Sequence, residues 1–201
     1  MSASPFSRIA RYGFAMLAVL ALSACGINSI PTAEEAAKAR WADVQAAFQE
    51  RANLVPNLAE VASSAAEQEK EILTGVIEAR AKATSIQVSA DDLADPAKMA
   101  QFQAAQEQLG AGLGRLLASF ERYPDLKSIA NYQMLQSQLE GQENRIRISI
   151  RDYNEAVRDY NTRVRTFPEM IGAMIRGAKP LVPYQAATPG AEVAPSLEGK
   201  L

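Results

Sequence analysis

Apolar residues recur along most of this chain at alternating steps of three and four, the spacing of one face of an amphipathic helix. The first such run covers residues 32–86 and keeps a heptad spacing over about seven repeats. The pattern predicts one long helix that packs through a coiled-coil-like seam. Its apolar positions are Ala37, Trp41, Val44, Phe48, Val55, Leu58, Ala62, Ala65, Ile72, Val76, Ala79, Ala83 and Ile86.

Local signals refine the bounds of this first helix. Thr32 follows a proline and precedes Glu35 by three residues, which predicts a capping box with Thr32 as the N-cap. Pro56 removes one backbone donor, yet the apolar spacing continues in phase on both sides of it. We therefore expect a kinked but continuous helix at Pro56, and two helices that meet there are the alternative.

A second helix is predicted after a turn at residues 85–96. Asp95 precedes a proline and so has the pattern of an N-cap followed by proline at the first helical position. The glycines of this helix each lower its helix propensity by roughly 1 kcal/mol, and their small size would allow another helix to approach closely. They are Gly110, Gly112 and Gly114, and the apolar positions are Met99, Phe102, Leu109, Leu113, Leu116 and Phe120.

A third amphipathic pattern predicts a helix over residues 128–165, and a short fourth helix over 169–176 ends at Gly177. Residues 178–201 are rich in proline and small residues without a helical or strand period, which predicts a flexible or extended tail. Short turns between long amphipathic helices require antiparallel neighbours. The sequence thus predicts an all-α fold, an antiparallel up-and-down bundle of three long helices and one short one, over residues 32–177.

The start of the chain is typical of a secretory signal peptide. Arg8 and Arg11 precede an apolar run at residues 13–22, which is much shorter than the roughly 20 residues that a membrane-spanning helix needs. The only cysteine, Cys25, follows Leu-Ser-Ala, and these four residues resemble the lipobox of bacterial lipoproteins. In such proteins a diacylglycerol alkylates the cysteine sulfur, and the leader is cut off just before it.

This resemblance predicts a signal peptide at residues 1–24, an acyl anchor on Cys25 and a short lipidated tether over residues 25–31. The membrane lipid would then be the first partner of the protein, since two or more acyl chains hold a protein firmly on a bilayer. Gly26 follows the cysteine where the sorting rule of two-membrane bacteria places Asp for inner-membrane retention. The glycine at this position therefore predicts that the protein is located at the periplasmic face of the outer membrane. A buried core cysteine is the alternative.

Composition and charge exclude several functions. The chain has 201 residues, a formal net charge of −2 and no cluster of basic residues, so nucleic acid is not an expected partner. It contains no histidine, and its single cysteine is assigned to the lipid, so neither a zinc site nor a nucleophile–base pair is predicted. The acidic clusters do not match a calcium loop. We expect no cofactor, no metal and no enzymatic activity. The clusters are Glu67, Glu69 and Glu71, and Asp91, Asp92 and Asp95.

Three stretches together resemble the LemA family of bacterial envelope proteins. They are RANLVPNLAEV at 51–61, EARAKATSIQ at 78–87, and ERYPDLK continuing to LEGQENRIRISIRDYNEAVRDYN at 121–161. The resemblance implies an all-α bundle on the outer side of a membrane, tethered at its N-terminus, and it brings no settled enzymatic activity. Asn53 stands where the family typically has an acidic residue.

The repeat RDYNEAVRDYN places Tyr153 and Tyr160 seven residues apart on one helix face, with Asn154 and Asn161 beside them. A tyrosine offers apolar area with a polar tip, so this stripe is a candidate recognition surface. The interpretation that we prefer is a pair of core tyrosines whose hydroxyls reach a neighbouring helix.

Polar residues also interrupt the predicted seams, at Arg51, Glu69, Gln106 and Glu143. Gln106 and Glu143 lie at nearly the same height in the expected bundle, which predicts a hydrogen bond between them. Polar groups in a helical seam usually fix register or partner choice. We therefore expect a role in register, and a ligand or proton site is the alternative.

These features predict a lipid-anchored helical protein of the bacterial cell envelope with a structural or adaptor role. Its partners would be the membrane and other envelope proteins, while its oligomeric state is left open. The alternative function is a binding module for a small ligand or a cell-wall fragment, which would use the tyrosine–asparagine stripe or a groove near the glycines.

Overall fold

The computed structural model describes residues 5–63, 70–120 and 130–185, and it describes the side chains of these residues except at 5–12, 14–27 and 62–63. The described elements are α1 (Pro5–Ser63), α2 (Lys70–Ser85), the short 3₁₀ helix η2 (Ala90–Asp92), α3 (Pro96–Phe120), α5 (Ala130–Arg165) and α6 (Glu169–Arg176). No strand occurs in these ranges. The predicted all-α fold is therefore confirmed.

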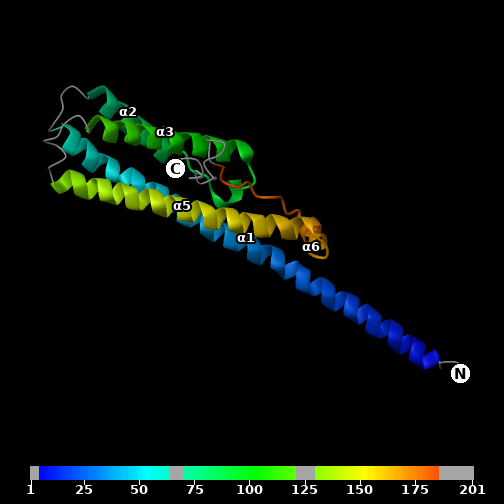
Figure 1. Ribbon diagram of the computed structural model, residues 1–201. Helices are drawn as coiled ribbons and strands as arrows, with labels where there is room; N and C mark the ends of the chain where they lie inside the picture. Colours follow the sequence, from blue (N-terminus) through cyan, green and yellow to red (C-terminus); the bar gives the residue numbers. More distant parts are fainter. Residues whose placement is uncertain (1–4, 64–69, 121–129, 186–201) are drawn as a thin grey trace, which may run out of the picture.

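The bundle consists of two helix pairs. Figure 1 shows α1 and α5 lying side by side, with α2 and α3 forming the second pair and α6 at the end of α5. Arg51 of α1 contacts Glu143 of α5, and Tyr160 of α5 lies near Glu34 of α1, so these two helices are antiparallel. None of the helices, as far as they are described, is long and apolar enough to span a membrane.

The single helix predicted over residues 32–86 is wrong, because the chain reverses within it. α1 ends at Ser63, α2 begins at Lys70, and Nε of Arg80 donates a hydrogen bond of 2.8 Å to the carbonyl oxygen of Ala52. In one straight helix those two residues would be about 42 Å apart. The heptad spacing did not reveal the reversal because each arm of a helical hairpin buries its own seam, in the same period. Glu69 lies outside the described residues.

The other expectation for the first helix, that it continues through Pro56, is confirmed. Its predicted start is wrong, because α1 already contains Pro31 and Thr32. The hydroxyl of Thr32 does not cap a helix but donates to the carbonyl oxygen of Asn28 at 2.9 Å.

The predicted tether over residues 25–31 is helical, and the bundle begins before residue 32. Ile30 is only 1% exposed and packs in one cluster with Ala33 and Ala37. Burying an isoleucine contributes about 1.5–3 kcal/mol, which is comparable to the cost of about 3 kcal/mol for a proline inside a helix. This burial offsets the local signal for a helix start.

The beginning and packing of α3 agree with the sequence. Oδ1 of Asp95 accepts hydrogen bonds from the backbone N–H of Ala97 at 2.9 Å and of Lys98 at 3.3 Å, so Asp95 is the predicted N-cap. A Cβ on Gly112 would lie 3.3 Å from Cγ2 of Val76. The missing side chain at Gly112 therefore lets α2 approach α3 closely.

After the short helix, the described part of the predicted flexible or extended tail is extended and packed against the bundle. α6 ends as predicted at Gly177, whose φ of 64° lies in the left-handed region that favours glycine. Residues 178–185 then run as an extended segment along α5 and bury Leu181 and Tyr184. We call residues 178–185 the strap. Residues 186–201 lie outside the described part.

Candidate functional site

The tyrosine–asparagine repeat of α5 is the site at which the strap is bound. Tyr153 and Tyr160 are 0% and 2% exposed, while Asn154 and Asn161 are half-buried. All four side chains make hydrogen bonds to the backbone of the strap. The preferred interpretation of core tyrosines is thus right about their burial, but their hydroxyls reach the strap and not a neighbouring helix.

The two asparagines each hold one strap residue by both of its backbone groups. Oδ1 of Asn161 accepts from the N–H of Leu181 at 2.8 Å, and its Nδ2 donates to the carbonyl of the same residue at 2.9 Å. Asn154 makes the same two bonds to Tyr184, at 2.8 and 2.9 Å. An asparagine amide presents one donor and one acceptor side by side, as a neighbouring β-strand would.

The two tyrosines donate to carbonyl oxygens at intermediate points of the strap. The hydroxyl of Tyr153 lies 2.8 Å from the oxygen of Val182, and that of Tyr160 lies 3.1 Å from the oxygen of Lys179. Burial raises the pKa of both hydroxyls above the ordinary value for tyrosine. Both therefore remain protonated donors throughout the physiological pH range.

The periods of the helix and of the strap match. Seven residues of an α-helix rise about 10.5 Å, whereas three residues of an extended chain cover about 9–10 Å. Asn154 and Asn161 are seven apart and bind strap residues that are three apart, and the tyrosines also bind residues three apart. The repeat of α5 is therefore a ladder for an extended polypeptide that runs antiparallel to the helix.

The sequence of the strap fits this ladder. Pro180 and Pro183 have no N–H and are exposed, so no backbone donor is left unpaired at these positions. Leu181 and Tyr184 each follow a proline and point into the core. This three-residue alternation was the signal in the sequence that could have revealed the strap, but it belongs neither to the helical nor to the strand period.

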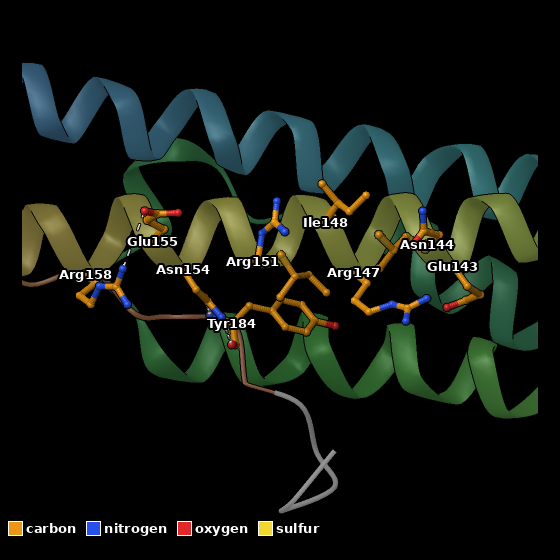
Figure 2. Close-up of a pocket in the computed structure, with 11 residues that line it drawn as sticks. Glu143, Asn144, Arg147, Ile148, Arg151, Asn154, Glu155, Arg158 and Tyr184 are labelled. Atoms are coloured by element: carbon orange, nitrogen blue, oxygen red, sulfur yellow. Dashed lines mark hydrogen bonds and ion pairs between the residues drawn. The ribbon is translucent and has the colours of Figure 1, made fainter. Parts of the chain in front are cut away.

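A groove of about 1110 Å³ continues along α5 beyond the bound end of the strap. Figure 2 shows the Tyr184 ring lying in this groove, next to Asn154 on one side and Arg147 on the other. Its charged lining residues are Glu143, Arg147, Arg151, Glu155 and Arg158, and the remaining ones are Asn144, Ile146, Ile148, Ile150, Asn154 and Tyr184. The groove is thus a mixed apolar and basic surface in line with the strap.

Two of the three groove arginines have acidic neighbours on α5. Arg151 pairs with Asp152 at 2.9 Å, and Arg158 lies 3.9 Å from Glu155. Arg147 has no carboxylate partner among the described residues. Its guanidinium is therefore available to an acidic group that enters the groove.

The polar residues that interrupt the seams meet at a buried arginine. Nη1 of Arg51 donates to Oε1 of Glu143 at 2.9 Å, and Nη2 donates to both the backbone oxygen and Oε1 of Gln106, at 2.9 and 3.1 Å. Gln106 in turn donates to the carbonyl of Ala83 at 3.3 Å. The predicted bond between Gln106 and Glu143 is replaced by Arg51, which lies between them. Their role in register stays a prediction.

The buried arginine is also linked to the strap through aromatic rings. Arg51 is 4% exposed, and its guanidinium carbon lies 5.0 Å from the centre of the Phe48 ring. Phe48 also stacks against Tyr184, with their ring centres 5.8 Å apart. Nε of Arg51 is buried without a hydrogen-bond partner. The arginine cluster is therefore connected through the Phe48 ring to Tyr184 at the end of the strap.

Cys25, the acidic turn before α3 and metal binding are the remaining predicted features. Cys25 lies within α1, but its side chain is outside the description, so its lipidation stays a prediction. In the turn before α3, Asp92 accepts hydrogen bonds from Lys98 and Ser89, and these bonds lower its pKa to about 2. Within the described ranges no group of three or more His, Cys, Asp or Glu side chains is placed to hold a metal ion.

Comparison with known proteins identifies one family. The sequence model of the LemA family matches residues 40–198, which include the arginine cluster, the ladder and the strap. No protein among the curated ones compared with the chain matches it. The matched region begins after Cys25 and so leaves the predicted anchor outside.

Proposed function

The chain belongs to the LemA family, and we propose that it is a lipid-anchored adaptor that binds extended segments of other cell-envelope proteins. Family membership supports a helical protein associated with the envelope. The ladder on α5 supports the adaptor role, and the lipobox that ends at Cys25 supports the anchor.

The observation that carries the adaptor role is the way in which α5 holds the strap. Its hydrogen bonds go to backbone groups, which every polypeptide has, while side-chain pockets accept only Leu181 and Tyr184. Main-chain bonds of this kind supply affinity in many peptide-binding proteins, and pockets supply specificity. The groove continues past Tyr184, so an extended segment of a partner can lie there in line with the strap.

The anchor would set where this surface is presented. Cys25 and Arg51 are 26 residues apart on one helix, which corresponds to about 39 Å. The arginine cluster and the adjacent groove would thus stand well clear of the bilayer. In a host with two membranes, Gly26 favours the periplasmic face of the outer membrane, where other envelope proteins are the available partners.

A small ligand or cell-wall fragment at the tyrosine–asparagine stripe receives no support from the geometry. Tyr153 and Tyr160 are closed off from solvent, and the strap covers the stripe. A ligand there would have to displace Leu181 and Tyr184 from the core. The geometry therefore favours the adaptor role over ligand binding at this stripe.

The adaptor role can be tested by photo-crosslinking in intact cells. A photoreactive amino acid at Arg147, which lines the groove, is expected to capture envelope proteins in discrete adducts that mass spectrometry identifies. The matched control is Ser137, which is exposed on the same helix outside the groove. Equal adduct patterns at both positions, or none at Arg147, would contradict an adaptor that uses this groove.

The anchor is tested separately with Cys25→Ser. The variant has no sulfur to alkylate, so its partition into the membrane fraction is expected to fall at least about tenfold. Each acyl methylene that is lost removes about 0.8 kcal/mol of membrane affinity. The mass of the native protein should show cleavage before Cys25 and two or more acyl chains. An intact leader with a free thiol on the native protein would disprove the anchor.

A further inference from the structure

Exposed apolar side chains gather at one end of the helical bundle. Eight large hydrophobic residues are exposed in the described ranges, and five of them lie within residues 167–175. The most exposed are Phe167 at 77% and Met174 and Ile175 at 74% each. We call the set the α6 face; it comprises Phe167, Met170, Ile171, Met174 and Ile175.

The other side of α6 explains why this face points outward. Gly172 and Ala173 are buried, and Ala173 shares a core cluster with Ile30 and Ala37 of α1. α6 is therefore fixed to the bundle by its small residues, while its large apolar ones remain in solvent. Soluble proteins rarely expose such a contiguous apolar surface unless it binds something.

The position of α6 indicates what it binds. Its buried side packs against α1 at Ile30, and Cys25 precedes Ile30 by only five residues, about 7.5 Å along a helix. Figure 1 shows α6 at the end of the bundle from which the N-terminal part of α1 projects. The α6 face and the predicted acyl anchor thus lie at the same end of the rod.

The charges around the α6 face fit a membrane surface. Arg165, Arg176 and Lys179 are exposed around it, and none has a carboxylate partner in the part of the chain that the structure describes. The nearby Glu169 is already paired with Arg163 at 3.2 Å. An apolar face bordered by basic residues is typical of helices that lie in the interface of an anionic bilayer.

We propose that the α6 face inserts into the interface of the same bilayer that holds the acyl chains of Cys25, with Arg176 and Lys179 against anionic phospholipid headgroups. This inference rests on the proposed anchor for the identity of the membrane. The acyl anchor and the α6 face together restrict the tilt of the bundle relative to the bilayer. A flexible lipid anchor alone does not restrict this tilt. The ladder and groove on α5 are then held in a defined orientation above the surface.

The test uses the acylated protein, purified from cells and reconstituted in vesicles of phosphatidylethanolamine and phosphatidylglycerol. Because the diacylglyceryl group would occupy the sulfur of Cys25, Ile175→Cys introduces the only free thiol, which is labelled with a fluorophore. Brominated lipid chains are expected to quench this label at least twofold. Met134→Cys is the matched control, since Met134 is 55% exposed near the far end of α5, and its label should not be quenched.

A second variant separates insertion from mere proximity. Met174→Glu in the Ile175→Cys background places a charge on the α6 face at a side chain that is 74% exposed, so the fold should be retained. Quenching at 175 is expected to fall to less than half. Unchanged quenching in this variant, or equal quenching at 134 and 175, would overturn the proposal.

Other occupants of the face give different results. If a second copy of the chain covers it, the label at 175 is shielded from an aqueous quencher in proportion to protein density and is not quenched by bromolipid, which overturns the proposal. If the mass shows an unmodified Cys25, the anchor fails, and the comparison is repeated in a Cys25→Ser background on the same vesicles. Quenching confined to 175 then supports the α6 face by itself, and its absence disproves it.

Discussion

Replacing Arg51 with alanine is expected to lower the free energy of unfolding by about 3 kcal/mol, because the variant loses three hydrogen bonds that the charged guanidinium donates, one of them to a carboxylate. The guanidinium joins α1 to Gln106 of α3 and Glu143 of α5 and covers Phe48. Without it, the backbone oxygen and the side-chain oxygen of Gln106 lose the hydrogen bonds that Arg51 donates. Urea denaturation followed by circular dichroism measures the change.

Two companion variants show which part of the cluster matters. Glu143→Gln should cost no more than about 1 kcal/mol, because the Glu143 side chain is 52% exposed and water screens its ion pair. Arg51→Met keeps an apolar stem but removes the charge together with the three hydrogen bonds that the guanidinium donates. If it recovers most of the stability but broadens the thermal transition or changes the oligomeric state, the cluster acts in register. An Arg51→Ala protein as stable as Glu143→Gln would contradict a buried arginine.

The helices of the bundle were largely predictable because their burial follows the period of the chain. Met99, Leu109 and Leu116 of α3, and Leu135, Ile146 and Val157 of α5, are all buried where the spacing of three and four places them. Local chemistry also located Asp95 and Gly177 at helix ends. Each of these signals acts within one element or at its end.

The reversal between α1 and α2 could not be read from the same signals. Val55 and Leu58 on one arm and Val76 and Ala83 on the other are buried in one cluster, and all keep the heptad spacing. The period tells which side of a helix is buried but not against what. A hairpin whose two arms share one phase therefore has the same pattern as one straight helix.

The sequence predicted only one half of the ladder, the repeat on α5, and it did not predict the strap that the repeat binds. The repeat of Tyr153 and Tyr160 was visible because it lies within one helix, but its occupant lies 19–30 residues further along the chain. Residues 178–185 have a period of three, which matches neither regular element. Pairing between a seven-residue and a three-residue period appears only once both segments are placed side by side.

The geometry of this pairing leads to the second large effect. Replacing both Asn154 and Asn161 with alanine is expected to lower the free energy of unfolding by about 4 kcal/mol, since four hydrogen bonds of about 1 kcal/mol each are lost. Each single variant should cost about half of this. The backbone groups of Leu181 and Tyr184 that lose their partners are partly buried against α5, so the strap is expected to leave α5 and rehydrate.

Release of the strap limits the effect and provides its specific signature. Once the strap has left, further loss of ladder contacts costs nothing more, so adding Tyr153→Phe to the double variant should change stability far less than it does in the unaltered chain. Hydrogen exchange at the amides of Leu181 and Tyr184, and protease cleavage within residues 178–185, should accelerate by more than about tenfold. Asn144→Ala, at an exposed position of the same helix, is the control. If the double variant protects these amides as well as the control does, the strap is held by its apolar side chains alone, and the ladder is not what binds an extended chain.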